Sequence, residues 1–299
     1  MVSVVQADLF ASQGQTAQNS VQPFSLQLLK WIGNKQRYAH EIVSYFPPSY
    51  GTYYEPFLGS GAVLGTLAPK RAIASDVLPP LMGIWLTLAS EPQRLLRWYR
   101  SRWEAYQRAP TRTYERIRAR FSRKPNPADL LFLARACYGG VVRFRKDGHM
   151  STPPGVHSPI SPESFARRIE VWRERVRGTV FRCCDFEEAI AEARAGDLIY
   201  CDPPYHDTQT ILYGAQAFDL ERLFAAIERA KARGVFVALS LDGTKKSGRK
   251  LVALPTPPQG LFERAAFVHC GRSMLRRFQV GGASVADEVV SDRLFLTWS

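Results

Sequence analysis

Short apolar runs rich in β-branched or aromatic residues recur along the chain, and segments with helical periodicity separate several of them. Each run has the length of a strand, so the alternation predicts an open, mainly parallel α/β sheet. The helical period is clearest at 220–233, where Leu220, Phe224 and Ile227 recur at spacings of four and three. We expect the last two strands to pair antiparallel. The predicted strands are 52–57, 71–75, 179–182, 198–201, 235–240, 265–269 and 293–298.

The gap between the second and third predicted strands is about a hundred residues, longer than a crossover connection needs. We therefore predict an inserted region at 91–178. The flanking segments 24–90 and 179–299 would together form the main domain. Residues 1–23 are rich in Gln, Ser, Ala and Val with little periodicity, which predicts a disordered tail.

The chain carries 40 Lys and Arg against 27 Asp and Glu, which gives a formal charge of +13. A field of this sign attracts polyanions or anionic membrane surfaces. No apolar run approaches the roughly 18 residues of a spanning helix, so nucleic acid is the favoured partner and no membrane is expected. Much of the excess charge falls at about 91–124, and we predict that Arg116, Arg120 and Lys124 bind DNA.

The same basic segment also carries an apolar stripe. Leu95, Tyr99, Trp103 and Tyr106 fall on one face of a helix, so we expect them to pack the core of the insert rather than to stack on bases. The arginines around this stripe would then face solvent or phosphate.

Cysteine usage argues against a disulfide framework and a zinc cluster. The chain has 5 Cys, an odd number, and none forms a C-x-x-C pair. The N-terminus lacks the layout of a signal peptide. These features favour a cytoplasmic protein with no metal.

The second half of the insert has the pattern of a β-ribbon. Asp147 and Gly148 are a predicted hairpin tip. Arg143 and Arg145 flank Phe144, so in an extended segment both guanidinium groups point to one side. Arginine forks of this kind match guanine edges in the DNA major groove.

The most specific motif is Asp202-Pro203-Pro204-Tyr205, which directly follows the apolar run 198–201. Ligand sites of open α/β sheets lie at such strand ends. The two prolines remove two N–H donors and leave a carboxylate, carbonyl oxygens and an aromatic ring together. This arrangement suits a planar base with an exocyclic amine, whose hydrogens Asp202 and the Pro203 carbonyl accept while Tyr205 stacks on the ring. The structural alternative is an acidic turn with a packed tyrosine.

Three further segments support a site for a small molecule. Residues 55–61, Glu-Pro-Phe-Leu-Gly-Ser-Gly, follow the first strand, and their glycines let a ligand or a helix approach the backbone closely. Asp76 ends the second strand, where an acid in this fold type reaches the ribose hydroxyls of a nucleoside. Residues 30–35 combine cations, an indole and a glycine, which suggests a lid over a small molecule.

In this order, the segments resemble those of the Dam-like DNA adenine-N6 methyltransferases, whose cofactor motifs precede a target-recognition insert and a catalytic motif. The resemblance spans about 28–298. It implies a Rossmann-like sheet of seven strands with the last one antiparallel, a mainly helical inserted target-recognition domain, S-adenosylmethionine as methyl donor, and double-stranded DNA as substrate. A bacterial or phage-encoded protein, with or without a companion restriction enzyme, is the implied source.

The resemblance also assigns individual residues. Asp202 to Tyr205 match the catalytic tetrapeptide in full, and the loop 55–61 matches the turn around the methionine part of the cofactor. Asp76 matches the acid that binds the cofactor ribose, and Asp185 with Phe186 resembles the pair that meets its adenine. The implied cofactor-binding residues are Trp31, Lys35, Phe57, Gly59, Gly61, Asp76, Asp185, Phe186 and Asp202.

The implied mechanism follows from the chemistry of adenine N6, whose lone pair is delocalised into the ring. Accepting its two hydrogens at Asp202 and the Pro203 carbonyl directs that lone pair toward the sulfonium methyl group. A duplex base must first turn out of the helix, and stacking on Tyr205 recovers part of that cost.

In the family, the ribbon that matches Tyr138 to Arg145 approaches the bases, and Arg143 aligns with an arginine that reads guanine. Gly139 stands where members specific for GATC carry an asparagine that pushes into the base stack, so the sequence does not establish GATC as the target. The C-terminal segment 272–279, which contains three arginines, would add phosphate contacts.

Residues 6–10, Gln-Ala-Asp-Leu-Phe, resemble the short motif by which bacterial replication and repair proteins dock on the sliding clamp. Leu9 and Phe10 would fill an apolar pocket while Gln6 anchors its rim. The hypothesis is that this tail recruits the enzyme to newly copied DNA.

Four alternative functions compete with this interpretation. A cytosine-N4 DNA methyltransferase or an RNA adenine methyltransferase would keep the methyl donor. A DNA-binding homologue without catalysis is disfavoured by the intact Asp202 and Asp76. A nicotinamide-dependent oxidoreductase is disfavoured because the turn with Gly59 and Gly61 lacks the third glycine of the dinucleotide fingerprint.

Overall fold

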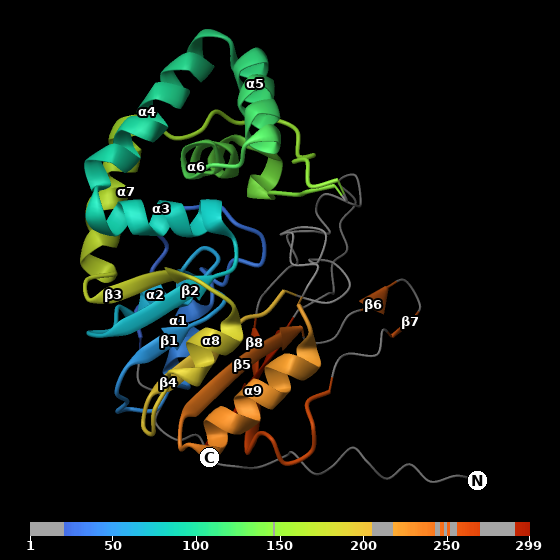
Figure 1. Ribbon diagram of the computed structural model, residues 1–299. Helices are drawn as coiled ribbons and strands as arrows, with labels where there is room; N and C mark the ends of the chain where they lie inside the picture. The colour runs from blue at the N-terminus through green and yellow to red at the C-terminus, as the bar shows by residue number, and fades with distance from the viewer. Residues whose placement is uncertain are drawn as a thin grey trace.

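The computed structural model describes residues 21–145, 147–204, 218–242, 246–247, 250–251, 256–269 and 291–299. Its main element is a seven-stranded sheet with the strand order β3-β2-β1-β4-β5-β9-β8 (Figure 1). The five strands from β3 to β5 are parallel, and β9 is antiparallel to both β5 and β8. The strands are β1 (Tyr53–Glu55), β2 (Ala72–Asp76), β3 (Thr179–Cys183), β4 (Leu198–Cys201), β5 (Phe236–Asp242), β8 (Arg264–His269) and β9 (Ser291–Leu296).

The sheet confirms the predicted fold class and each of the predicted strands, with shifts of one to two residues at most ends. The predicted antiparallel pairing of the last two strands is also confirmed. The short strands β6 (Lys246–Ser247) and β7 (Lys250–Leu251) form a separate antiparallel pair, which the sequence patterns did not predict.

Helices cover both faces of the sheet (Figure 1). On one face, α1 (Ala39–Ser44) and α2 (Ala62–Leu67) pack into a hydrophobic core that includes Tyr53, Ala72 and Tyr200. On the other face, α8 (Phe186–Ala191) and α9 (Leu220–Ala232) enclose a second core around Ile199, Val237 and Leu239. Burial on both faces explains why the central strands have no polar alternation.

Five helices lie between β2 and β3 in the chain: α3 (Pro79–Ser90), α4 (Pro92–Arg108), α5 (Pro110–Arg123), α6 (Pro127–Ala136) and α7 (Pro162–Arg175). Each of them begins with a proline, a residue whose fixed φ suits the first helical turn and whose missing N–H costs nothing there. The side chains of Asn126 and Ser161 cap α6 and α7 by accepting backbone N–H groups. The sequence therefore defines the start of each helix locally.

The apolar stripe of α4 packs inward, as predicted. Leu95, Tyr99 and Tyr106 are buried, and Trp103 is partly buried with its indole N–H donated to the Pro159 carbonyl at 3.2 Å. The Tyr99 ring contacts those of Phe132 and Phe165. These residues belong to the same core as α1 and α2, so the inserted helices are packed continuously onto one side of the sheet.

One buried carboxylate ties three of these helices together. Asp129 on α6 has a fully buried side chain and accepts hydrogen bonds from Arg102 on α4 and Arg120 on α5, each at 2.7 Å. Asn126 adds a further bond at 2.9 Å. Because a buried charge needs partners, these residues fix the mutual positions of α4, α5 and α6.

Candidate active site

A cavity opens at the carboxyl ends of β1, β2 and β4, the point where the strand order reverses between β1 and β4. Such a reversal is where open α/β sheets bind their ligands, because the flanking connections leave in opposite directions. Residues far apart in the sequence line this cavity: Trp31, Lys35, Glu55, Phe57, Gly59, Asp76, Val77, Cys184, Asp185, Phe186, Asp202, Pro204 and Phe218.

Most of the predicted cofactor and catalytic residues are therefore in one place. Gly61 and Pro203 are not among the side chains that line the cavity. Gly61 instead forms the N-cap of α2 with φ of 64°, and a Cβ there would come within 2.9 Å of Trp85. Tyr205 lies outside the described residues.

Lys35 and Asp202 form an ion pair inside the cavity. The Lys35 ammonium lies 2.9 Å from Asp202 Oδ1, and the two side chains are 4% and 19% exposed. The sequence resemblance assigns Lys35 to the cofactor, whereas in the structure its ammonium contacts the carboxylate of Asp202, the first residue of the tetrapeptide that the resemblance assigns to catalysis. An ammonium at this distance stabilises the ionised carboxylate, the form that accepts N–H hydrogens.

Glu55 is a buried acid at the end of β1 for which the sequence indicated no separate role. Its Oε2 accepts a hydrogen bond from the Tyr53 hydroxyl at 2.6 Å. Burial, followed by the nearby negative charge of Asp202, raises the pKa of Glu55 to about 8, although the Tyr53 bond opposes that shift. The position of Glu55 as an acid at the carboxyl end of a buried strand was the signal that could have identified it.

Asp76 organises the glycine turn next to it. Its Oδ2 accepts the Gly59 N–H and its Oδ1 accepts the Leu78 N–H, both at 3.1 Å. Burial raises the pKa of Asp76, while these backbone bonds act in the opposite direction. Gly59 has φ of 48° and a Cβ on it would lie 3.3 Å from the Trp31 indole. The turn and the acid are thus one local structure.

Aromatic side chains form one wall of the cavity. The Phe57 and Phe186 rings are stacked at 5.3 Å, and Phe218 lies edge-on to both at 5.8 and 5.9 Å. Asp185, next to Phe186, caps α8 by accepting the Glu187 N–H at 2.9 Å. Phe218 was missed by the sequence analysis because it precedes α9 and belongs to no recognised motif.

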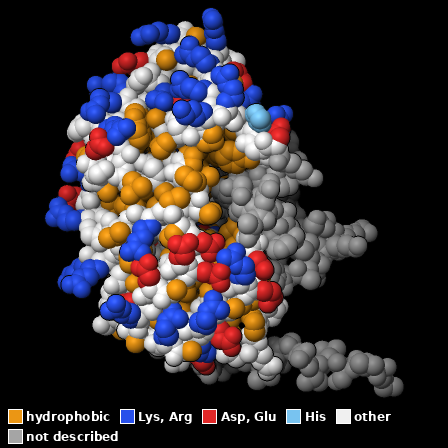
Figure 2. Space-filling view, viewed as in Figure 1, with side chains coloured by type: hydrophobic (Ala, Val, Ile, Leu, Met, Phe, Trp, Pro, Cys, Tyr) orange, Lys and Arg blue, Asp and Glu red, His pale blue; other side chains and the backbone are white. Residues whose placement is uncertain are grey.

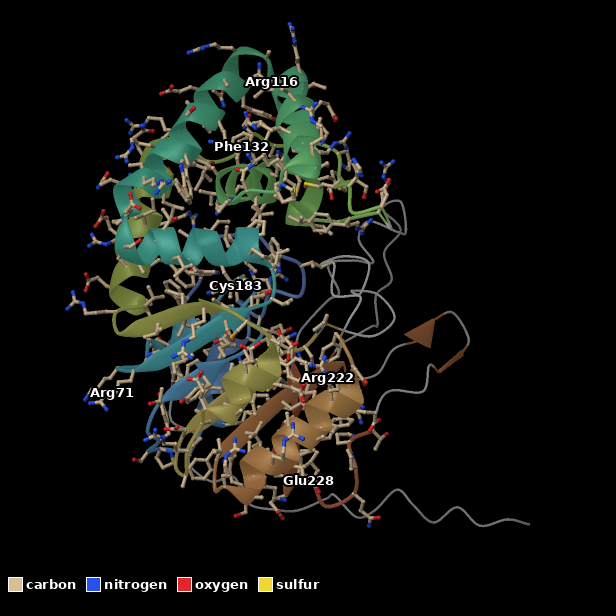
Figure 3. The ribbon with its side chains drawn as sticks, in the orientation of Figure 1. Arg71, Arg116, Phe132, Cys183, Arg222 and Glu228 are labelled. Carbon is tan, nitrogen blue, oxygen red and sulfur yellow. The ribbon has the colours of Figure 1, made fainter. Side chains whose placement is uncertain are left out.

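The predicted DNA-binding residues lie on the helices and loops above the cavity. Figure 2 shows Lys and Arg side chains gathered over the region of α4 and α5, and Figure 3 shows Arg116 projecting from α5. Arg116 and Lys124 are exposed. Arg120 is half exposed but is bonded to the buried Asp129, so it has a structural contact that the sequence did not predict.

The ribbon between α6 and α7 has the predicted tip. Gly148 has φ of 78° and donates its N–H to the Arg145 carbonyl at 2.9 Å. Phe144 packs against Phe121, whereas Arg143 and Arg145 are exposed on either side of it. Arg145 also pairs with Asp147 at 3.0 Å.

The turn that precedes this ribbon holds Tyr138, which is 39% exposed, and Gly139, which has φ of 63°. This left-handed conformation suits Gly and also Asn, the residue that GATC-specific members carry there.

Several predictions fall on residues that the structure does not describe. They are residues 1–20 of the predicted disordered tail, which include the clamp-like segment with Gln6, Leu9 and Phe10, the basic segment 272–279, and Tyr205. Within the described part of the chain, no cluster of His, Cys, Asp and Glu is arranged to hold a metal ion. The helices described there also include none long and apolar enough to cross a membrane.

Comparison with known proteins gives consistent relatives. A DNA adenine methylase of Vibrio cholerae is 28% identical over 234 residues, which cover 74% of this chain and 83% of the relative. The retron Ec67 DNA adenine methylase of Escherichia coli is 30% identical over 188 residues, which cover 60% of this chain and 64% of the relative. Among solved structures, the rRNA methyltransferase aviRa from Streptomyces viridochromogenes covers 87% of this chain and 84% of its own, with 17% identity and a TM-score of 0.36, too low to carry an argument.

A family model covers the part of the chain that holds the cavity and the inserted helices. It matches residues 31–249, which include both Lys35 and Asp202, and it describes D12 class N6 adenine-specific DNA methyltransferases. The resemblance drawn from the sequence motifs is thereby confirmed: this chain belongs to the D12 class N6 adenine-specific DNA methyltransferase family.

Proposed function

We propose that this protein transfers a methyl group from S-adenosylmethionine to N6 of an adenine that is turned out of double-stranded DNA. The observation that carries the proposal is the ion pair between Lys35 and Asp202. It lies at the carboxyl ends of the parallel strands β1, β2 and β4, in the same cavity as the residues matched to cofactor binding. Family membership supports the same reaction.

The residues that line the cavity fit the proposed cofactor. The rings of Phe57, Phe186 and Phe218 form an apolar wall against which a purine can pack, and the carboxylate of Asp76 lies beside a glycine turn, where it can meet ribose hydroxyls. Gly59 has no side chain that would fill the space next to Trp31. When bound, S-adenosylmethionine supplies the electrophilic methyl group.

The chain's own residues prepare the adenine. We propose that the Asp202 carboxylate and the Pro203 carbonyl each accept one amine hydrogen, which leaves the nitrogen lone pair directed at the methyl group. Lys35 keeps the carboxylate ionised and fixes its orientation. Pro203 and Pro204 restrict the backbone around the accepting carbonyl. Tyr205 would stack on the everted base.

We propose that residues 91–178 are the target-recognition region, joined to the catalytic segments 24–90 and 179–299. The exposed Arg116, Lys124 and Arg145 would contact phosphates, together with the exposed edge of Arg120. Arg143 and Tyr138 would approach bases from the ribbon. With DNA as substrate and bacterial relatives, the proposed compartment is the cytoplasm.

Methyl transfer itself is the decisive measurement. The protein is incubated with methyl-labelled S-adenosylmethionine and either duplex DNA or RNA, and the polymer is digested to nucleosides. Labelled N6-methyladenine nucleoside from DNA supports the proposal, whereas labelled N4-methylcytidine or label only in RNA contradicts it. Asp202→Ala should abolish transfer, and the variant should still unfold in a cooperative thermal transition, at a lower Tm because the buried Lys35 loses this partner.

We also propose that Gln6, Leu9 and Phe10 dock on a bacterial sliding clamp, a hypothesis that rests on the motif alone. Clamp retention on immobilised protein should fall after the double substitution Leu9→Ala and Phe10→Ala. Equal retention by both proteins would end the hypothesis.

A further inference from the structure

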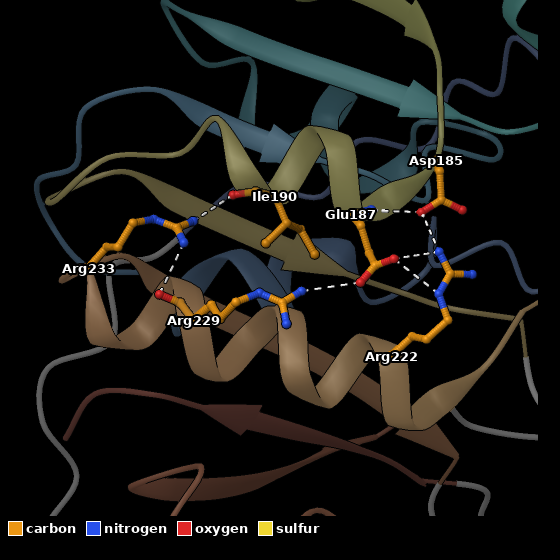
Figure 4. Close-up of polar contacts among 6 residues, drawn as sticks. All are labelled: Asp185, Glu187, Ile190, Arg222, Arg229 and Arg233. Atoms are coloured by element: carbon orange, nitrogen blue, oxygen red, sulfur yellow. Dashed lines mark hydrogen bonds and ion pairs between the residues drawn. The ribbon is translucent and has the colours of Figure 1, made fainter.

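Arg222, in the first turn of α9, reaches across to α8 and contacts three consecutive residues (Figure 4). Its Nε and Nη2 donate to Glu187 Oε2 at 3.0 and 2.5 Å, and its Nη2 donates to Asp185 Oδ1 at 3.2 Å. Its guanidinium carbon lies 5.1 Å from the centre of the Phe186 ring. One side chain therefore holds the segment that forms the aromatic end of the cavity.

The attachment of α8 to α9 does not depend on Arg222 alone. Arg229 donates to Glu187 Oε1 at 3.2 Å, and Arg233 donates to the Ile190 carbonyl at 2.9 Å (Figure 4). Leu223 and Ile227 pack against the buried side of α8. Neither of the other two arginines has a contact with Asp185 or Phe186 in the part of the chain that the structure describes.

Among the residues that the structure describes, both polar contacts of the Asp185 side chain use the same oxygen. Oδ1 accepts the Glu187 N–H at 2.9 Å and the Arg222 guanidinium at 3.2 Å, and neither contact uses Oδ2. Two hydrogen bonds to Oδ1 fix the orientation of the Asp185 carboxylate, and they thereby fix the direction in which Oδ2 points. The positive charge of Arg222 also offsets the repulsion between the carboxylates of Asp185 and Glu187.

We propose that Arg222 is a positioning residue that makes the cavity selective for an adenine nucleoside. It would do so by holding Asp185 as an acceptor for an exocyclic amine and Phe186 as part of the apolar wall of the cavity. The proposal rests on the proposed function, and on the sequence resemblance that assigns the cofactor adenine to Asp185 and Phe186. Hypoxanthine presents a carbonyl oxygen where adenine presents an amine, so a fixed carboxylate accepts a hydrogen bond from adenine and repels hypoxanthine.

The test compares the binding of two neutral cofactor analogues by titration calorimetry, S-adenosylhomocysteine and S-inosylhomocysteine. Wild-type protein should bind the adenosine compound more tightly. Arg222→Ala should weaken that binding by about tenfold, the scale of one hydrogen bond to a charged group, and change the inosine compound far less. The dissociation constant of the inosine compound divided by that of the adenosine compound should therefore fall. A purely structural role of Arg222 would weaken the binding of both compounds equally and leave this ratio unchanged.

Arg229→Ala is the matched control, because it removes an arginine of the same helix that also binds Glu187. It should leave the ratio at the wild-type value. Arg222→Gln, which keeps the length and an N–H donor but loses the charge and the fork, should lower the ratio even if the alanine variant does not fold.

Folded Arg222 variants with the wild-type ratio would overturn the inference, whether their affinity for the two compounds is unchanged or equally reduced. Failure of the wild-type protein to bind either compound would contradict the proposed cofactor site instead, so the two proposals fail in distinguishable ways.

Discussion

The ammonium of Lys35 and Oδ1 of Asp202 are 2.9 Å apart, although Lys35 belongs to the segment 24–90 and Asp202 to the segment 179–299. Lys35 lies in the loop before α1 that also holds Trp31, and Asp202 follows β4. The lysine that the sequence resemblance assigns to the cofactor thus contacts the acid that is proposed to bind the substrate amine. Its removal should affect chemistry more than cofactor binding.

We expect Lys35→Met to lower the single-turnover rate of methyl transfer by at least roughly tenfold, about 1.4 kcal/mol of transition-state stabilisation. The dissociation constant for S-adenosylhomocysteine should change much less. Lys35→Arg keeps the charge and should recover part of the rate. A variant with weakened cofactor binding and an unchanged transfer rate would show that Lys35 acts on the cofactor alone.

The buried Glu55 should make the protein less stable as the pH rises. The folded protein holds this proton up to about pH 8, whereas the unfolded chain releases it near the ordinary pKa of 4.5. Between these values the unfolded state binds fewer protons, so the free energy of unfolding falls with pH by up to about 1 kcal/mol per pH unit. Glu55→Gln should remove this slope in urea denaturation at pH 5.5, 6.5 and 7.5.

Glu228→Gln is the control for that series, because Glu228 is an exposed carboxylate on α9 (Figure 3). It should leave the pH slope of the wild-type protein unchanged. The same slope in wild type and Glu55→Gln would contradict a proton on Glu55.

Alanine substitutions of Arg116 and Arg120 should have different effects, the first on DNA affinity and the second on the stability of the helix packing. Arg116→Ala should weaken duplex binding and reduce the slope of log affinity against log salt by about 1, without a change in Tm. Arg120→Ala should lower the Tm because the buried Asp129 loses one of its partners. A Tm that falls equally in both variants would place Arg116 in the packing as well.

Substitutions of Gly140 and Gly148 test whether the turn Tyr138–Gly140 affects the position of the Lys30–Lys35 loop. Both have positive φ, 69° and 78°, so alanine strains the backbone by about 1 kcal/mol at each. A Cβ on Gly140 would lie 2.6 Å from the Lys30 side chain, whereas a Cβ on Gly148 meets nothing within 4 Å.

Gly140→Ala should therefore reduce kcat for methylation, because it displaces the loop that carries Trp31 and Lys35. Gly148→Ala should lower the Tm with little effect on kcat. Equal kcat in the two variants, with both folded, would contradict the coupling.

Local patterns in the sequence determined the elements of this fold. The strand-length runs and the helical stripes depend on residues within a few positions of one another. Because both faces of the sheet are buried, these apolar segments form strands and helices in the structure as the patterns predict. The stripe of Leu95, Tyr99 and Tyr106 packs as its period predicts. The tetrapeptide at Asp202 and the glycine turn before α2 could be placed at strand ends for the same reason.

Only the tertiary structure decided which of these residues meet. Three ion pairs join elements that the strand order and the helix packing bring together. They are Lys35–Asp202, Arg120–Asp129 and Arg222–Asp185. No local period encodes such contacts, because they depend on where each crossover returns the chain. The sequence by itself indicated the seven strands of the main sheet, the helical periods of α4 and α9, and the positions of the motifs. Only the folded structure determined which positive charge lies next to Asp202, Asp129 and Asp185.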